Sequence, residues 1–281
     1  MSFNTTFGRT GREVTRVGLG GEGVLRTFGR EEEALAVIGE SVAQGIGYFD
    51  SARVYAGSEG YYGLFWPEHP SQRAGAFQAS KSASRDRSGA LADLETTLSM
   101  MGLDHLDLWQ IHDLRTWQDV REVEAPGGAL EAFLEAREQG LTRHIGVTGH
   151  HDPAVLTHAV QSWDLDSVLL PVNPVEGLLG GFLTSTLPSA RERGIAVVGM
   201  KVLGAGHYLN PRAGVTPELL VRYALTQEAT LVTVGCSNPR EVQALARTGR
   251  EFQPLPEKEE ARLLEAFRPY ARKLAYYRGV I

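Results

Sequence analysis

The sequence has a single cysteine, Cys236, among its 281 residues. One cysteine in a chain excludes both an internal disulfide framework and a metal site built from several cysteines of that chain. No apolar run is long enough to cross a bilayer, and residues 1–5 lack the basic-then-apolar pattern of a secretory signal. These absences predict a cytoplasmic protein that has no membrane as its partner.

The sequence also lacks an excess of basic charge. Its 28 Lys and Arg residues against 34 Asp and Glu give a net charge of -6, and no basic patch of the kind that binds nucleic acid is present. A composition of 42% hydrophobic and 22% charged residues is ordinary for a soluble globular protein. Because no low-complexity linker divides the chain, residues 1–281 predict a single domain.

Short apolar runs alternate with segments of helical spacing along the whole chain. After a small hairpin within residues 7–20, the predicted strands are 17–20, 46–49, 76–79, 106–111, 144–147, 167–171, 195–199 and 231–234. The predicted helices are 30–44, 58–65, 88–101, 128–138, 153–163, 182–193, 217–227, 239–247 and 256–274. This alternation predicts parallel strands joined by helical crossovers. No Gly-x-Gly-x-x-Gly follows the first strand, so the pattern favours an α/β fold of the (β/α)₈ TIM-barrel type, with an N-terminal β-hairpin, over a doubly wound sheet.

Polar side chains follow three consecutive predicted strands at the barrel face where active sites lie. Asp50 and Tyr55 follow the second strand, Lys81 the third and His112 the fourth. A carboxylate at the end of a buried strand is costly unless a cation meets it, so we expect Lys81 to pair with Asp50. The same ammonium beside Tyr55 would lower the pKa of the phenol and make it a usable general acid. His112 would then orient a substrate oxygen.

Each of these residues also has a plainer structural explanation. Asp50 and Lys81 are compatible with a structural ion pair, His112 with a hydrogen-bonded core histidine, and Tyr55 with an ordinary loop aromatic. The concentration of all four on one predicted face favours chemistry, namely protonation of a carbonyl oxygen. None of them can supply a hydride, which would have to come from a nicotinamide cofactor.

The pattern resembles the aldo-keto reductase family. Asp50, Tyr55, Lys81 and His112 look like its catalytic tetrad, and further matching stretches occur in order along nearly the whole chain. Residues 9–20 are similar to the opening hairpin and first strand, residues 49–63 and 103–112 to two signature regions, and residues 140–147 to the approach to the fifth strand. Residues 200–204, Met-Lys-Val-Leu-Gly, resemble a bacterial subgroup.

The resemblance implies a role for each member of the tetrad. Tyr55 would donate the proton, Lys81 would lower the pKa of Tyr55, Asp50 would hold Lys81, and His112 would position the carbonyl. The reaction implied is reduction of a small-molecule aldehyde or ketone to an alcohol, or its reverse, with hydride exchanged with NAD(P)(H). The physiological substrate, the reaction direction and the oligomeric state stay open. Candidates for the wall of the substrate pocket are Val24, Val54, Trp66, Trp117, Tyr276 and Tyr277.

The residues that would hold the nicotinamide depart from the family pattern. His150 and His151 stand where many members have Ser-Asn, so His150 would bind the carboxamide unless this stretch is simply a polar turn entering a helix. Asn173 is the nearest candidate for the family glutamine. Met200 replaces a stacking aromatic residue with a softer apolar surface. The residues expected to face the pyrophosphate are Lys201, Leu203, Gly204 and Gly206.

The segment after the eighth strand bears on the choice between NADP(H) and NAD(H). Ser237 and Arg240 are candidates for binding the 2′-phosphate, and Gly235 is a further cofactor-binding candidate in the same segment. Glu241, however, falls near a family arginine, and a carboxylate repels phosphate while accepting a hydrogen bond from a ribose hydroxyl. Glu241 is equally explained as an acidic residue favoured in the first turn of a helix. The resemblance therefore implies NADP(H), with NAD(H) left open.

Two functions of other classes stay open beside the reductase. One is a redox-sensing or regulatory barrel that binds the cofactor with little turnover, which tight binding without activity would reveal. The other is a metal-dependent hydrolase using His112, Asp113, His150 and His151, which explains neither Lys81 nor Tyr55. The tetrad itself requires no metal.

Overall fold

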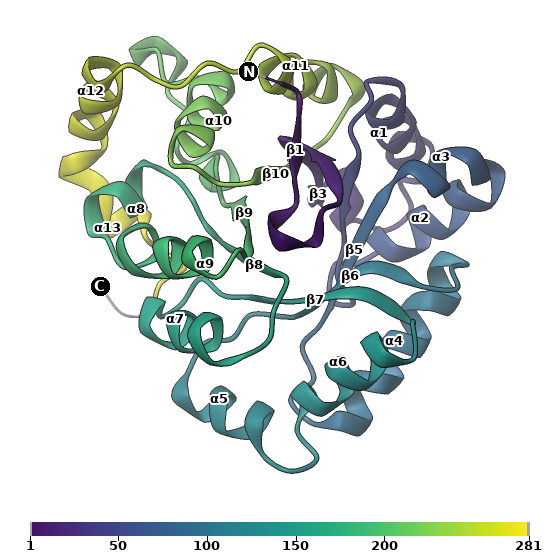
Figure 1. The fold of residues 1–281 in the computed structure, drawn as a ribbon. Coiled ribbons are helices and arrows are strands. Elements are labelled where there is room, and N and C mark those ends of the chain that lie inside the picture. The colour runs from purple at the N-terminus through teal and green to yellow at the C-terminus, as the bar shows by residue number, and fades with distance from the viewer. Residues whose placement is uncertain (1, 280–281) are drawn as a thin grey trace.

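The centre of the computed structural model, which describes residues 2–279, is a closed barrel of parallel strands (Figure 1). The eight strands follow one another in the order β10-β3-β4-β5-β6-β7-β8-β9. Their bounds are β3 (Val17–Gly23), β4 (Tyr48–Asp50), β5 (Phe77–Ser82), β6 (Leu106–Ile111), β7 (Thr142–Thr148), β8 (Ser167–Pro171), β9 (Ala196–Met200) and β10 (Leu231–Cys236). Pairing of Val232 with Val17 closes the barrel. The predicted (β/α)₈ barrel is therefore confirmed.

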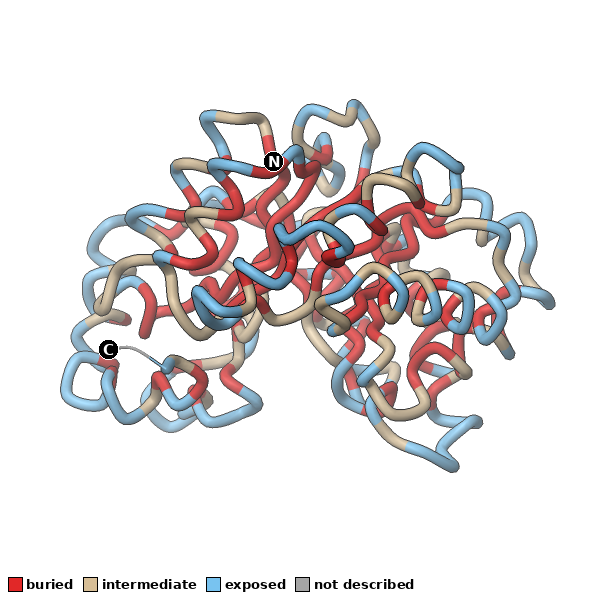
Figure 2. The backbone as a smooth tube through the Cα atoms, turned by 90° about the horizontal axis from the view of Figure 1, so that it is seen from below, coloured by how far each residue is buried: buried red, intermediate tan, exposed pale blue. Residues whose placement is uncertain are grey.

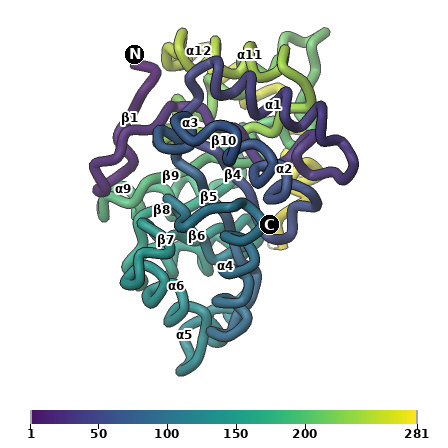
Figure 3. The backbone as a smooth tube through the Cα atoms, turned by 90° about the vertical axis from the view of Figure 1, so that its right-hand side faces the viewer, coloured from purple at the N-terminus to yellow at the C-terminus, as the bar shows by residue number. Residues whose placement is uncertain are grey.

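Helices surround the barrel, as helical crossovers between parallel strands require. Their bounds are α1 (Glu31–Ala43), α2 (Ser58–Phe65), α3 (Pro70–Gly75), α4 (Arg87–Met101), α5 (Trp117–Glu124), α6 (Ala129–Glu138), α7 (Pro153–Ser162), α8 (Pro174–Leu179), α9 (Leu187–Glu192), α10 (Pro217–Thr226), α11 (Pro239–Arg250), α12 (Glu257–Phe267) and α13 (Ala271–Leu274). In Figure 3, α1 and α11 lie together at one side and α5 and α6 at the other. No helix within residues 2–279 is long and apolar enough to cross a bilayer.

Alternation of side chains along each strand divides the core into two parts. On β6, Leu108 belongs to a cluster inside the barrel, whereas its neighbour Trp109 belongs to the larger cluster between the strands and the helices. This is the period of two expected for a strand that is buried on both faces. Figure 2 shows the result as a buried centre under an exposed outer layer.

The N-terminal hairpin covers the end of the barrel at which the strands begin. It consists of β1 (Asn4–Thr6) and β2 (Glu13–Thr15), paired antiparallel as predicted. Phe7, in the turn between them, has no solvent exposure and enters the inner cluster. The centroid of its ring lies 4.7 Å from that of Phe77 and 6.1 Å from that of Tyr48. The hairpin thus leaves only the opposite end of the barrel open for a site.

Some helices differ from the sequence-based prediction. Helix α5, which was not predicted, begins at a capping box in which Thr116 and Asp119 bond each other's backbone. A π-helical turn, Phe182–Thr186, precedes α9 where one continuous helix was expected. The predicted helix 256–274 is interrupted at Arg268–Tyr270, where Pro269 lacks an N–H to continue the hydrogen-bonding pattern.

We expect Phe7→Ala to lower the free energy of unfolding by about 3–5 kcal/mol, because it removes a fully buried ring and leaves a cavity at the barrel floor. Urea unfolding followed by circular dichroism measures this change. Phe28→Ala is the matched control, since Phe28 is 78% exposed and its loss should cost less than about 0.5 kcal/mol. Equal effects of the two substitutions would show that the hairpin does not seal the core.

Candidate active site

Lys81 and Asp50 form an ion pair inside the open end of the barrel. The Lys81 Nζ atom lies 2.6 Å from Asp50 Oδ2 and 2.6 Å from the carbonyl oxygen of Ser51. The two residues end adjacent parallel strands, because Asp50 on β4 pairs in register with Ala79 on β5. Lys81 has no solvent exposure and Asp50 is 4% exposed. The parallel pairing of β4 and β5 therefore creates the contact that the sequence predicts.

Burial of this ion pair is unfavourable for each of its two charges, because both lose their hydration. Burial raises the pKa of Asp50 and lowers the pKa of Lys81, while their mutual attraction opposes both shifts. Asp50 Oδ1 is also buried and makes no hydrogen bond to the described residues. A buried ion pair with an unsatisfied oxygen is a poor source of stability. Perturbed pKa values of this kind are instead typical of functional sites.

Tyr55 lies against the pair, in the loop between β4 and α2. Lys81 Nζ is 4.8 Å from the centroid of the Tyr55 ring, and the guanidinium carbon of Arg26 is 5.0 Å from the same centroid. The ring also makes an edge-to-face contact with His112, with centroids 5.5 Å apart. A Cβ atom on Gly21 would lie 2.6 Å from Tyr55 Cδ2, so only glycine leaves room for the ring. Arg26 was not identified from the sequence, where no local pattern marks it.

Burial is the main influence on the pKa of the Tyr55 phenol. It raises the pKa of Tyr55 well above its ordinary value, Asp50 and Glu22 raise it further, and Arg26 opposes the rise. Asp50, which pairs with Lys81 at 2.6 Å, therefore opposes the lowering that an isolated ammonium beside the phenol would produce. Tyr55 therefore keeps its proton at neutral pH and holds it ready for transfer.

His112 is a neutral imidazole beside this phenol. Burial, reinforced by the positive charge of Lys81, lowers the pKa of His112 to about 3. Its backbone N–H donates to the carbonyl oxygen of Ser82 at 2.8 Å, which fixes it at the end of β6. Its buried Nδ1 makes no hydrogen bond to the described residues. A neutral histidine offers one donor and one acceptor, which suits the orientation of a carbonyl oxygen.

A buried carboxylate holds the loop that carries Tyr55. Glu59, 1% exposed, accepts hydrogen bonds from Ser80 Oγ at 2.7 Å and from Thr97 Oγ1 at 2.8 Å, and it forms an ion pair with Arg53. The backbone N–H of Arg53 donates to the carbonyl oxygen of Lys81 at 3.1 Å. These bonds join the loop to β5 and α4. Glu59 lies in a stretch that resembles a family signature, but its positioning role is visible only in three dimensions.

Three residues predicted to bind the cofactor, His150 and Asn173 at the nicotinamide and Lys201 at the pyrophosphate, meet at a tyrosine from the C-terminal segment. His150 Nδ1 lies 3.2 Å from the carbonyl oxygen of Tyr277, and Asn173 Nδ2 donates to the Tyr277 hydroxyl at 3.1 Å. Lys201 Nζ lies 5.4 Å from the centroid of the Tyr277 ring. Met200 packs on the inner cluster next to Lys201. The structure brings the predicted residues together, with Tyr277 between them.

The loop after β9 has an unusual backbone. Lys201 has φ +53°, and Gly204 has φ +55° with space for a Cβ atom occupied by the Tyr208 ring at 2.5 Å. Leu203 packs on the main core, and Gly206 also has a positive φ, of +87°. Burial lowers the pKa of Lys201, whose ammonium makes no ion pair with the described residues. The loop therefore presents a largely buried cation near the tetrad.

The segment after β10 begins α11 and uses Glu241 for that purpose. The Glu241 carboxylate accepts hydrogen bonds from the Ser237 N–H at 2.7 Å and from Asn238 Nδ2 at 3.0 Å, while Asn238 caps the Glu241 N–H. Gly235 lies against Glu22, where a Cβ atom would approach to 2.6 Å. Arg240 is exposed and makes no hydrogen bond or ion pair with the described residues. Arg240, rather than Glu241, is thus available to a ligand.

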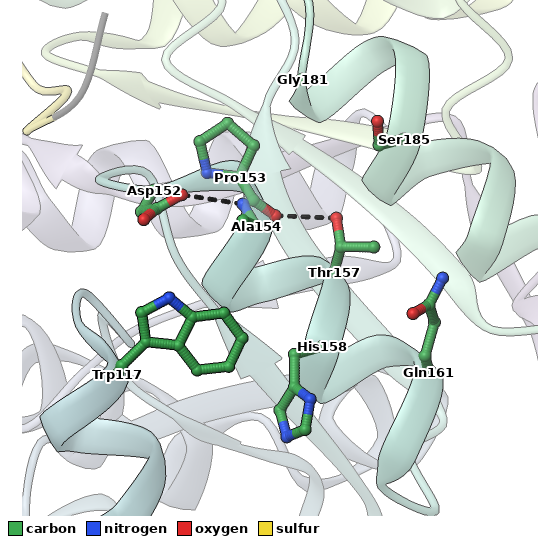
Figure 4. Close-up of a pocket in the computed structure, with 9 residues that line it drawn as sticks. All are labelled: Trp117, Asp152, Pro153, Ala154, Thr157, His158, Gln161, Gly181 and Ser185. Carbon is green, nitrogen blue, oxygen red and sulfur yellow. Dashed lines mark hydrogen bonds between the residues drawn. The ribbon is translucent and has the colours of Figure 1, made fainter.

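Among the described residues, the structure does not bring together the side chains that a metal site would need, nor does it place the two predicted tryptophans at the open end of the barrel. Within residues 2–279, no three side chains of His, Cys, Asp or Glu gather in a way that would hold a metal ion. Trp66 is buried and donates to Gln78 Oε1 at 2.9 Å, so it does not line the open end of the barrel. Trp117 lines a groove on the outer ring of helices, shown in Figure 4.

That groove lies between α5, α7 and the π-helical turn, away from the tetrad. Its polar groups already have partners: Asp152 Oδ1 accepts from the Ala154 N–H at 2.8 Å, and Thr157 Oγ1 donates to the Pro153 carbonyl oxygen at 2.7 Å. Figure 4 shows both bonds beside the exposed Trp117 ring. The groove lies outside the barrel and contains none of the four residues Asp50, Tyr55, Lys81 and His112, so the open end of the barrel is the candidate active site.

The chain is similar to known proteins of one family. The family model described as the aldo/keto reductase family matches residues 16–213. The chain is 25% identical over 222 residues to L-galactose dehydrogenase of Arabidopsis thaliana, an alignment covering 71% of this chain and 65% of that protein. It is 30% identical over 168 residues to a methylglyoxal reductase of Yersinia pestis, covering 59% of this chain and 54% of that protein. The chain thus spans less than two thirds of each of these relatives.

Solved structures of similar fold cover nearly all of the chain. The holo form of an aldo-keto reductase from Bacillus halodurans has a TM-score of 0.76 at 20% identity, covering 100% of this chain and 98% of that one. An aldo-keto reductase from Klebsiella pneumoniae in complex with NADPH has a TM-score of 0.75 at 18% identity, covering 96% of each chain. At these identities the likeness establishes the fold.

We expect His112 to make the stability of the protein dependent on acid pH. Its folded pKa of about 3 lies below its ordinary value of 6.5, so between these values the unfolded state binds the proton more tightly. The contribution of His112 to stability is therefore complete above pH 6.5 and is lost, by about 1.4 kcal/mol per pH unit, as the pH falls toward 3.

Urea midpoints at pH 7.5 and pH 5 measure this effect. His112→Asn should show a smaller decline between the two pH values than the wild type. His158→Asn, on the outer face of α7, should keep the wild-type decline. If His112→Asn declines as steeply as the wild type, His112 is not a buried neutral histidine.

Proposed function

The chain belongs to the aldo/keto reductase family, and from that premise we propose that it reduces an aldehyde or ketone to an alcohol, or catalyses the reverse, with a nicotinamide cofactor. The observation that carries the proposal is the contact of Tyr55 with both Lys81 and His112 at the open end of the barrel. The names of the two curated relatives, a dehydrogenase and a reductase, support the same reaction class. We further propose that the protein acts in the cytoplasm on a small molecule.

The residues of the site would perform the proton transfer. His112, as a neutral imidazole, would hold the carbonyl oxygen beside Tyr55, which donates its proton to that oxygen. The phenolate left behind would lie near the ammonium of Lys81, whose charge Asp50 keeps in place. Because the surroundings are buried, this fixed charge acts in a medium of low dielectric constant. A bound reduced nicotinamide supplies the hydride that completes the alcohol.

The residues around the site fit such a cofactor. Lys201 is a largely buried cation that Glu22 and Asp113 influence only through longer-range attraction, which leaves its ammonium suited to a pyrophosphate. Arg240 is an exposed guanidinium at the start of α11, which suits a 2′-phosphate. His150 and Asn173 would bind the carboxamide. We therefore propose NADP(H) as the cofactor, which the NADPH complex of the Klebsiella pneumoniae structure supports.

Turnover should depend on the Tyr55 hydroxyl. We expect Tyr55→Phe to lower the rate of carbonyl reduction by about 10²–10⁴-fold, because it removes the proton donor and keeps the ring. Absorbance of the reduced nicotinamide across a panel of aldehydes and ketones measures the rate, and a fluorescence titration measures cofactor affinity, which should stay within about twofold of the wild type. Tyr270→Phe, on the surface, is the control.

Two outcomes would contradict this role. Loss of cofactor binding in Tyr55→Phe would show that the residue supports the cofactor site rather than the proton transfer. Tight cofactor binding by the wild type with no turnover of any carbonyl would favour a regulatory barrel instead.

Cofactor preference should depend on Arg240. We expect Arg240→Ala to raise the Kd for NADPH by about 10–100-fold, because a charge-assisted hydrogen bond to the 2′-phosphate is lost, and to leave the Kd for NADH unchanged. Glu241→Gln is the matched variant at the next position, and it should change the ratio of the two Kd values little because Glu241 bonds its own loop. If Glu241→Gln alone shifts the ratio toward NADPH, then Glu241 governs the ribose site.

A further inference from the structure

The last described residues, Tyr276–Gly279, form a segment that we call the tail. It follows α13, which packs against α8, and reaches the start of α7, where the Gly279 N–H bonds the His151 carbonyl oxygen. Tyr277 is 6% exposed, and the Arg278 side chain is 5% exposed. The tail is therefore packed into the protein rather than lying over it.

The tail is attached to a buried carboxylate. Glu176 on α8, with no exposure of its side chain, accepts a hydrogen bond from the Tyr277 hydroxyl at 2.7 Å. It also forms an ion pair with Arg278 at 2.5 Å. Beyond it, the Gly279 N–H donates to the carbonyl oxygen of His151 at 3.1 Å. These contacts specify one position for Tyr277.

That position coincides with residues proposed to hold the cofactor, His150 and Asn173 at the carboxamide and Lys201 at the pyrophosphate. Asn173 donates its amide hydrogen to the Tyr277 hydroxyl, and Lys201 places its ammonium over the Tyr277 ring. The ring of His150 meets the Tyr277 ring edge to face, with centroids 6.0 Å apart. An aromatic ring carrying hydrogen-bonding groups thus already occupies the partners that a nicotinamide ring with its carboxamide would use.

His150 contacts the tail through a backbone oxygen. Its Nδ1 lies 3.2 Å from the Tyr277 carbonyl oxygen and can donate its hydrogen there. Its Nε2 lies 3.2 Å from Asp113 Oδ1, an oxygen that makes no hydrogen bond to the described residues. The tail is therefore held by side-chain contacts at Glu176 and by a single backbone contact at His150.

We propose that the tail is an internal competitor of the cofactor, and that Tyr277 must leave Asn173, His150 and Lys201 before a nicotinamide binds there. This inference rests on the proposed function. It makes the binding-competent form a minor population in the free protein, which weakens the apparent cofactor affinity by the fraction of chains in that form. The observed rate constant for cofactor binding would then reach a plateau at high cofactor concentration, because departure of the tail limits the rate.

A reversible crosslink tests the proposal in the intact chain. The hydrogen bond between the Gly279 N–H and the His151 carbonyl brings these residues close enough for a disulfide between His151→Cys and Gly279→Cys. A Cβ atom at Gly279 would overlap the His151 ring, and the first substitution removes that ring. The background is Cys236→Ser, which removes the single native cysteine.

Fluorescence titration with NADPH and with NADH would be done on the oxidised and the reduced forms. We expect the oxidised form to bind at least about 100-fold more weakly, and the reduced form to bind like the Cys236→Ser control. Equal affinity of the oxidised and reduced forms would overturn the proposal and leave the proposed function standing. Absence of binding by the wild type and by every variant would instead overturn the proposed function.

A second variant keeps the test independent of crosslinking. Tyr277→Phe retains the ring but removes both hydrogen bonds of the hydroxyl, to Asn173 and to Glu176. We expect NADPH to associate several-fold faster with this variant in stopped-flow fluorescence and to dissociate at the wild-type rate. An unchanged association rate would overturn the proposal. Tyr270→Phe, whose side chain is exposed and lies outside the tail, is the matched control and should behave as the wild type.

Discussion

The ammonium of Lys81 is buried inside the barrel, and the surroundings of the site follow from the need to keep it charged. Asp50 and the Ser51 carbonyl oxygen each meet it at 2.6 Å. Its charge helps to keep His112 neutral, and its position over the Tyr55 ring sets the distance between donor and cation. Replacing a buried ion pair with apolar residues often costs no stability. The stability of the fold therefore does not explain this pair, whereas a role in chemistry does.

The apolar half of the barrel makes that charge effective. Phe7 from the hairpin, Tyr48 and Phe77 fill the closed end and exclude water from below the pair. In such surroundings the field of an ammonium is weakened far less than in water. The hairpin is distant in sequence from Lys81, yet it strengthens the electrostatic effect of Lys81 by excluding water, and it also stabilises the fold.

The barrel, the hairpin and the pairing of Lys81 with Asp50 could be predicted from the sequence, because alternating segments and strand ends are visible as local patterns. The sequence was insufficient where the result depends on burial or on distant contacts. The pKa of Tyr55 rises because of its surroundings, which its neighbours in sequence do not reveal. The contact between Asn173 and Tyr277 joins residues 104 positions apart. The sequence around neither residue contains a pattern that predicts it. Helix α5 was missed because its capping box, rather than an apolar stripe, defines it.

Backbone strain identifies the same end of the barrel without reference to any family. Among the described residues, those other than glycine with positive φ are Ala56, Asp113, Lys201, Ala205 and Glu228. All but Glu228 lie in loops that follow β4, β6 or β9, at the open end of the barrel. Such conformations cost roughly 1–3 kcal/mol each and persist where the surrounding structure enforces them, commonly at functional sites. At Lys201 the strain places a largely buried cation beside Tyr277, with Glu22 and Asp113 as the nearby negative charges. Strain and burial at a cation both oppose folding, and their coincidence at Lys201 is what we expect of a residue that meets an anionic ligand.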